Sequence, residues 1–192
     1  RAKAKQASCM SNLKQLATAG IMYAQDYDDH MVKCYLYYGP LDPGRILVGI
    51  RWYWRSDSNP GMLYPYMKNK QIMRCPGGGC YGISRVVAQT GASAGRLREA
   101  IAQPAATIWL GDVLGYGGDP ATGKTPNHDA GAYGHCLTYT SYPNYQPGTA
   151  CNGRGLAAMR HNDMANFAFC DGHVKAMKSA ATRSPDNLWD LN

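Results

Sequence analysis

The segment near the end of the chain predicts a β-hairpin, which limits the fold more than any other part of the sequence. Asp171-Gly172 stands between two short apolar segments, and Asp-Gly favours a tight turn because glycine accepts a positive φ. A loop made of these two residues alone fixes the strand pairing, and side chains alternate between the two faces of a strand. This register predicts a core face made of Phe167, Phe169, Val174 and Ala176, and a more polar face made of Ala168, Cys170, His173 and Lys175.

Residues 3–26 predict an amphipathic helix. Apolar residues recur there at intervals of three and four, at Cys9, Leu13, Leu16, Ala17, Gly20 and Ala24, with Ile21 beside them. Asp26, Asp28 and Asp29 follow, and acidic residues at a helix C-terminus oppose the helix dipole. We therefore expect the helix to end near Tyr27, with one face on a sheet and the other facing solvent or a neighbouring subunit.

Two features of the middle of the chain predict a strand followed by a long loop. Residues 107–111 read as a buried strand that ends at Asp112. Between Gly115 and Gly155 the sequence is rich in Gly, Pro, Tyr, Asn and Asp and has no periodicity, and so long a loop is usually functional or clamped.

The hairpin segment resembles a known family. His161, nine further residues, Asp171-Gly172 and then His-Val-Lys resemble the H-X9-DG motif of prepilin-type proteins, relatives of type IV pilins and type II secretion pseudopilins. Residues 6–28 resemble the part of the family's N-terminal helix that lies against the globular head. Residues 63–76 resemble its mid-chain segment. The three blocks occur in the family's order and reach from near the start of the chain to about residue 177.

The resemblance implies an α+β fold, with an N-terminal helix in residues 1–28 packed on the antiparallel sheet of a pilin-like head in residues 29–192, with long loops. It also implies a structural subunit of an extracellular pilus-like or pseudopilus-like filament, not an enzyme. Such a subunit assembles into a homopolymer and meets secretion or pilus machinery at the cell surface. In the family an apolar, membrane-inserting segment precedes the residues that match Arg1; the chain itself contains no apolar run of about 18 residues.

The motif residues are expected to have structural roles. Ten steps of extended chain span roughly 33 Å, so His161 and Asp171 cannot meet along one straight strand. We expect His161 to be bonded near the start of the strand, and Asp171 and Gly172 to form the turn.

Seven cysteines without paired CxxC spacing favour disulfides, and hence an oxidising compartment such as a periplasm or the cell exterior. Cys136 and Cys151 flank the unperiodic loop, and closing about 15 residues contributes roughly 3 kcal/mol in the chain-entropy model. The resemblance implies a second bridge, between Cys9 and Cys75, because it lays the helix over the segment after Tyr66. The remaining assignments are a Cys34–Cys80 bridge and a free thiol at Cys170.

Oxygen ligands suitable for calcium occur in and beside the long loop, and related pseudopilins carry calcium in loops near the C-terminal end. The candidates are Asp112, Asp119, Asn127 and Asp129. Their spacing does not match an EF-hand. A loop held by hydrogen bonds is the favoured alternative to a calcium site.

Two other classes of function remain open. The segment 51–55, Arg-Trp-Tyr-Trp-Arg, suits stacking on bases or sugars, as in a surface-displayed minor pilin-like module that binds DNA or polysaccharide, but an edge strand with cation–π pairs is favoured. The net charge of +7 comes from dispersed residues, so no specific nucleic-acid site is evident. An enzyme would draw on His161, Cys170, Asp171 and His173. Cys170 and His173 could ligate zinc, but structural zinc normally has four ligands.

Overall fold

The structure of the protein is a computed structural model that describes residues 1–33, 35–37, 49–51, 60–88, 95–113, 136–137, 159–182 and 188. All structural statements below concern these residues. Within them, no helix combines the length and the apolar character that crossing a membrane requires.

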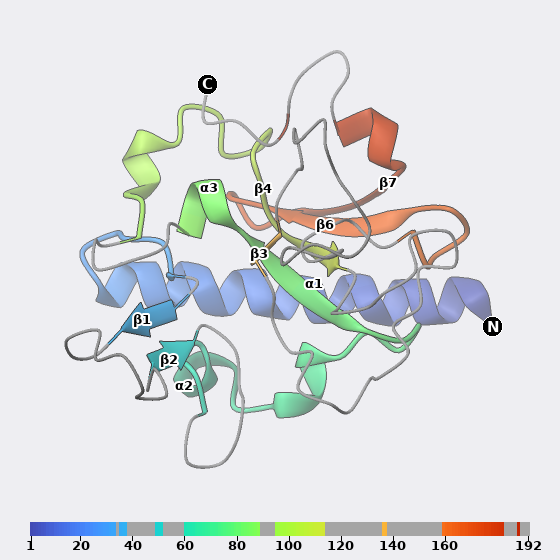
Figure 1. Ribbon diagram of the computed structural model, residues 1–192, viewed down its shortest axis with the longest axis horizontal. Helices are drawn as coiled ribbons and strands as arrows, with labels where there is room; N and C mark the ends of the chain where they lie inside the picture. The colour runs from blue at the N-terminus through green and yellow to red at the C-terminus, as the bar shows by residue number, and fades with distance from the viewer. Residues whose placement is uncertain are drawn as a thin grey trace, which may run out of the picture.

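A single long helix, α1 (Ala2–Asp26), runs along most of the molecule and confirms the predicted N-terminal helix (Figure 1). The side chains that it buries recur at three- and four-residue spacing: Cys9, Leu13, Leu16, Ala17, Ala19, Gly20, Tyr23 and Ala24. The helix ends as expected, because Tyr27 leaves the helical region and Asp28 and Asp29 both have positive φ. Arg98 then holds this corner through an ion pair of 2.9 Å with Asp29.

The helix packs against a sheet of strand order β5-β3-β4-β6-β7. Four strands pair antiparallel: β3 (Cys80–Ser84), β4 (Ile108–Val113), β6 (Ala165–Phe169) and β7 (Val174–Met177). The short β5 (Cys136–Leu137) pairs parallel with β3, and β1 (Tyr35–Tyr37) pairs with β2 (Gly49–Arg51) in a separate sheet. One helix on a mainly antiparallel sheet confirms the predicted α+β fold.

Short helices complete the described chain. They are α2 (Tyr64–Met67), η1 (Lys70–Met73), α3 (Arg85–Ala88), η2 (Arg98–Ala100) and η3 (Ser179–Thr182), the η elements being 3₁₀ helices. Both α2 and η1 contact α1 on the side away from β6 and β7 (Figure 1). The helix therefore contacts both the sheet and residues 64–73.

The sheet is buried on both faces. The face toward α1 belongs to the larger apolar cluster, which includes Leu13, Leu16, Trp109 and Ala168. The other face carries a second cluster, made of Ile108, Val113, Ala165, Phe167, Phe169 and Met177, with Met159 and Leu188 against it. Every residue of β4 and β6 is consequently buried.

A β-bulge in β4 decides which of its side chains face the helix. Ile108 pairs with Phe169, whereas Leu110 pairs with Ala168, so Trp109 is the extra residue. The bulge interrupts the alternation of side chains along β4, so the consecutive residues Trp109 and Leu110 both pack in the helix-side cluster. Asp112, two residues beyond Leu110, consequently faces the helix as well, where its carboxylate accepts a bond from the Cys9 thiol.

The predicted hairpin is present, but the predicted register is wrong by one residue. Ala168 pairs with Val174 and Phe167 with Lys175, not Phe169 with Val174. The loop has three residues because the Gly172 amide donates to the Phe169 carbonyl at 2.9 Å and Gly172 has φ +89°, which adds a glycine bulge to the turn.

The expected polar face of the hairpin is wrong for the same reason. Ala168, Cys170 and Val174 pack on the helix-side cluster, while Phe167 and Phe169 fill the cluster on the far face. A sheet covered on both faces therefore buries residues of both alternating sets.

Gly20 gives the first test of helix packing. A Cβ there would lie 1.8 Å from Cη2 of the fully buried Trp109. Gly20→Ala should therefore lower the free energy of unfolding by about 1–3 kcal/mol through overpacking, although alanine is the better helix former. Thr18→Ala, on the exposed side of α1, should stay within about 0.5 kcal/mol of wild type. Urea unfolding that finds Gly20→Ala more stable than wild type contradicts this packing.

The hairpin gives the second test. Phe167→Ala should cost about 3–5 kcal/mol because Phe167 is fully buried. Gly172→Val should also destabilise, since valine resists positive φ and its Cβ would lie 2.9 Å from Cδ1 of Ile21. Lys175→Ala, at the exposed position paired with Phe167, serves as the control. Denaturant curves in which both changes match this control refute the hairpin core.

Candidate metal centre

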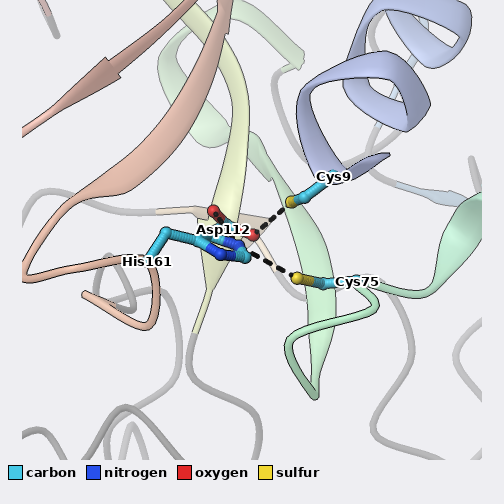
Figure 2. A group of neighbouring side chains, drawn as sticks. All are labelled: Cys9, Cys75, Asp112 and His161. Carbon is cyan, nitrogen blue, oxygen red and sulfur yellow. Dashed lines mark hydrogen bonds and ion pairs between the residues drawn. The ribbon is translucent and has the colours of Figure 1, made fainter. Parts of the chain in front are cut away.

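Four potential metal ligands meet where α1 crosses the sheet. Cys9 comes from α1, Cys75 from the segment after η1, Asp112 from β4 and His161 from the turn before β6 (Figure 2). One ligand atom from each residue lies within 4.8 Å of the other three. All four side chains are buried, with relative exposures of 0% for Cys9, 3% for Cys75, 0% for Asp112 and 2% for His161.

Direct contacts connect the four side chains. The Cys9 thiol donates to Oδ1 of Asp112 at 3.2 Å, and Sγ of Cys75 lies 3.1 Å from Nε2 of His161. The same Nε2 lies 3.5 Å from Oδ2 of Asp112. The Asp112 carboxylate therefore lies between Cys9 and His161, as the dashed lines in Figure 2 show.

The Cys75 sulfur is held by a turn rich in glycine. The Gly78 amide donates to the Cys75 carbonyl at 2.9 Å, and the Cys75 amide donates to the Gly79 carbonyl at 3.0 Å. The Gly77 amide points at the sulfur, 3.3 Å away. A Cβ on Gly77 would lie 2.8 Å from Cε1 of His161, so a larger residue would crowd the imidazole. The run of glycines thus lets the backbone close around the sulfur.

Groups outside the cluster also donate hydrogen bonds to Cys9 and Asp112. The Tyr81 hydroxyl donates to Sγ of Cys9 at 3.2 Å. The Asn166 amide, on β6 beside Asp112, donates to Oδ2 of Asp112 at 2.8 Å. The side chain of Asn166 is fully buried, and neither its nitrogen nor its oxygen has a hydrogen-bond partner within the described part of the chain.

The two cysteines have opposite protonation tendencies. The neighbouring Cys9 side chain lowers the pKa of Cys75 to about 4 despite burial, and the contact with His161 and the charge of Arg160 act in the same direction. Burial raises the pKa of Cys9, and its contacts with Cys75 and Asp112 raise it further. Cys75 is therefore the thiolate of the pair and Cys9 the thiol.

The pKa values of Asp112 and His161, the acid and the base of the cluster, are also shifted. Burial and the negative charge of Cys75 raise the pKa of Asp112 to about 6, although Arg160 and the Asn166 amide oppose this. Burial lowers the pKa of His161, but its bond to Cys75 and the charge of Asp112 outweigh burial and raise the pKa overall. Arg160 adds a fixed positive charge beside the cluster and donates to the carbonyls of Val113 and Gly78.

Two sulfurs, one imidazole nitrogen and one carboxylate make a ligand set that could hold a metal ion. A thiolate beside an imidazole also occurs in cysteine nucleophiles. Here both groups are at most 3% exposed, so neither meets a substrate at the surface that the described residues form. The arrangement fits the binding of a small ion better than nucleophilic catalysis.

The structure brings together residues that the sequence predicted separately. Cys9 and Cys75 are close together as expected, but both are free cysteines, so the predicted bridge is not formed. Asp112, one of the candidate calcium ligands, instead lies within 4.8 Å of two sulfurs and an imidazole nitrogen. The other calcium candidates, Asp119, Asn127 and Asp129, lie outside the described residues. So do Cys34 and Cys151 and the side chains of Cys80 and Cys136, which complete the other two predicted bridges.

The sequence did not predict that these four residues meet, although each of them lies in a segment with a recognisable pattern. Cys9, Cys75 and His161 each fall in one of the blocks that resemble the prepilin-type family, and Asp112 ends a predicted buried strand. The bulge at Trp109, which turns Asp112 toward the helix, leaves no comparable mark in the sequence.

The ends of the H-X9-DG motif have separate contacts. His161 joins the buried cluster, whereas Oδ1 of Asp171 accepts from the His173 amide at 3.0 Å and lies 2.7 Å from Nδ1 of His173. The ring of His173 stacks on Phe169, with centroids 4.2 Å apart. Cys170 is a buried free thiol, as predicted, and packs in the helix-side cluster.

No protein-family model, curated protein or solved structure matches the chain. The fold and the contacts of the described residues are therefore the observations on which its function is argued.

Cys170 gives a test of burial at a thiol outside the cluster. Burial and the adjacent charge of Asp171 raise the pKa of Cys170 to about 12. At pH 8 the thiolate fraction then falls roughly a thousandfold below that of an ordinary cysteine of pKa about 8.5. Native protein should therefore alkylate at Cys170 at least about a hundredfold more slowly than denatured protein. Peptide mapping that finds Cys170 in a disulfide, or equally fast alkylation in both states, contradicts this assignment.

Proposed function

We propose that the protein is a structural subunit of a pilus-like or pseudopilus-like filament on the cell surface, not an enzyme. The observation that carries the proposal is α1, a helix of 25 residues with one face buried along an antiparallel sheet. This arrangement agrees with the α+β head that the resemblance to prepilin-type proteins implies. A helix displayed in this way can pack against the same helix of another copy.

The outer face of α1 supports this role. Seven exposed residues follow one another there at three- and four-residue spacing: Ala4, Ala7, Ser11, Gln15, Thr18, Met22 and Gln25. None is charged; four have side chains no longer than that of threonine, two are glutamines and one is a methionine. Lys14, at the edge of this face, donates to the Gly172 carbonyl at 2.8 Å and so is tied to the hairpin turn. A mostly small, uncharged face lets a second helix approach closely without burying an unpaired charge.

The alternative function, binding of DNA or polysaccharide through residues 51–55, rests on side chains outside the described residues. Cys9, Cys75 and Cys170 are free, so the predicted exterior location depends on disulfides between the other cysteines. The filament proposal therefore depends on the helix and the fold, not on the cysteines.

The test is made on the full-length protein in the cells that produce it. Wild type should appear in the sheared surface fraction as filaments under the electron microscope. Ala7→Glu with Thr18→Glu puts two charges on the outer face of α1 and should reduce filaments by more than about tenfold, because burying unpaired carboxylates costs several kcal/mol. The matched control, Ala102→Glu with Ala105→Glu, adds the same charge at exposed sites away from α1 and should leave filaments unchanged.

The proposal fails if wild-type protein stays monomeric on cells and in the sheared fraction. It also fails if the two double variants reduce filaments equally while both remain folded by circular dichroism.

A further inference from the structure

We propose that Cys9, Cys75, Asp112 and His161 form a closed, four-ligand structural zinc site that fastens α1 to the sheet and to the turn after η1. The site is independent of the filament proposal. Four properties of the cluster favour zinc: its ligand types, its dimensions, its surroundings and its burial.

The ligand types select zinc. Thiolate, imidazole and carboxylate are the three side-chain ligands of protein-bound zinc, and structural sites use four of them. Calcium takes six to eight oxygens, of which this cluster offers one carboxylate. Copper electron-transfer sites use two histidines and one cysteine. Two sulfurs, one nitrogen and one oxygen therefore fit zinc better than either alternative.

The spacing of the ligand atoms also fits. Zinc bonds of about 2.3 Å to sulfur and 2.0–2.2 Å to nitrogen and oxygen place the corners of a tetrahedron about 3.3–3.8 Å apart. Sγ of Cys9 lies 3.2 Å from Oδ1 of Asp112, Sγ of Cys75 lies 3.1 Å from Nε2 of His161, and the same Nε2 lies 3.5 Å from Oδ2 of Asp112. All four ligand atoms lie within 4.8 Å of one another, so a decrease of at most about 1–1.5 Å in any separation would complete the coordination shell.

The surroundings orient and balance the ligands. Each acidic ligand accepts one hydrogen bond from outside the cluster: Cys9 from Tyr81, Cys75 from the Gly77 amide and Asp112 from the Asn166 amide. Such outer bonds fix metal ligands in place. Zinc binding would release the proton of the Cys9 thiol. Two thiolates and a carboxylate then carry three negative charges, of which a divalent ion neutralises two. Arg160, beside His161 and bonded to the carbonyls of Gly78 and Val113, supplies the remaining positive charge.

A disulfide between Cys9 and Cys75 would explain less of the cluster. It would use two of the four side chains and leave a fully buried carboxylate beside a buried imidazole. Buried charges are normally paired or coordinate a metal, because removing them from water is costly. A zinc ion uses all four groups at once. Their burial also fits a structural site, since catalytic zinc keeps a position open for water or substrate.

The direct test is metal analysis of the full chain, purified with a thiol-free reductant and dialysed against a mixture of zinc, iron and calcium. We expect about one zinc per folded chain and a melting temperature about 5–10 °C higher at a hundredfold excess over Kd than after chelation. Cobalt in place of zinc should give thiolate-to-metal charge-transfer absorption in the near-ultraviolet and d–d bands in the visible. These measurements need no variant, so a variant that does not fold cannot obscure them.

Variants then assign the ligands. Cys75→Ser, His161→Gln and Asp112→Asn should each lose most of the bound zinc and of the cobalt absorption. The matched controls Cys170→Ser and His173→Gln, outside the cluster, should retain both. The zinc site is refuted if folded, reduced wild type takes up no zinc or prefers another of the metals. It is equally refuted if the controls lose as much zinc as the ligand variants, or if freshly isolated native protein contains a Cys9–Cys75 disulfide.

Discussion

The close contact between α1 and the bulged strand β4 is the constraint on which the rest of the described structure depends. Gly20 lets the helix approach so near that Trp109 fills the space a side chain would take. The bulge at Trp109 places two bulky residues, Trp109 and Leu110, on the helix side of the sheet. The same bulge turns Asp112 toward Cys9. Packing of the apolar core and assembly of the polar cluster are thus consequences of one irregularity in one strand.

The helix has two unlike faces, and the fold uses one of them. Its inner face carries both the apolar contacts of the larger core and the Cys9 thiol, which lies among groups that bond to it. Its outer face is exposed and uncharged along its centre line. Because the inner face is anchored at Cys9, at Gly20 and through Lys14 to the hairpin turn, the outer face is presented in a fixed orientation. A surface held in this way is suited to assembly, since little further ordering is needed on association.

Sequence patterns were sufficient for features set by local periodicity and turn chemistry. The three- and four-residue spacing of α1, the apolar run of β4 and the Asp171-Gly172 turn predicted elements that the structure contains. The hairpin register was wrong because Asp-Gly suits both a two-residue loop and a three-residue loop with a glycine bulge, and the apolar residues fit either when both faces of the sheet are buried. The cluster was not predicted because its members are joined by tertiary packing and by a bulge that has no periodic signature.

The separation of the cluster residues along the chain has a consequence for the order in which the molecule is built. Cys9 and Asp112 are 103 residues apart, and Cys75 and His161 are 86 apart. A polypeptide leaves the ribosome from its N-terminus, so α1 and the glycine turn are made long before His161 is available. Until then the two thiols lack one or both of the partners Asp112 and His161 and are open to oxidation or to mispairing with other cysteines. The interval of synthesis between Cys75 and His161 is thus the period in which the chain most needs a reducing environment or a chaperone.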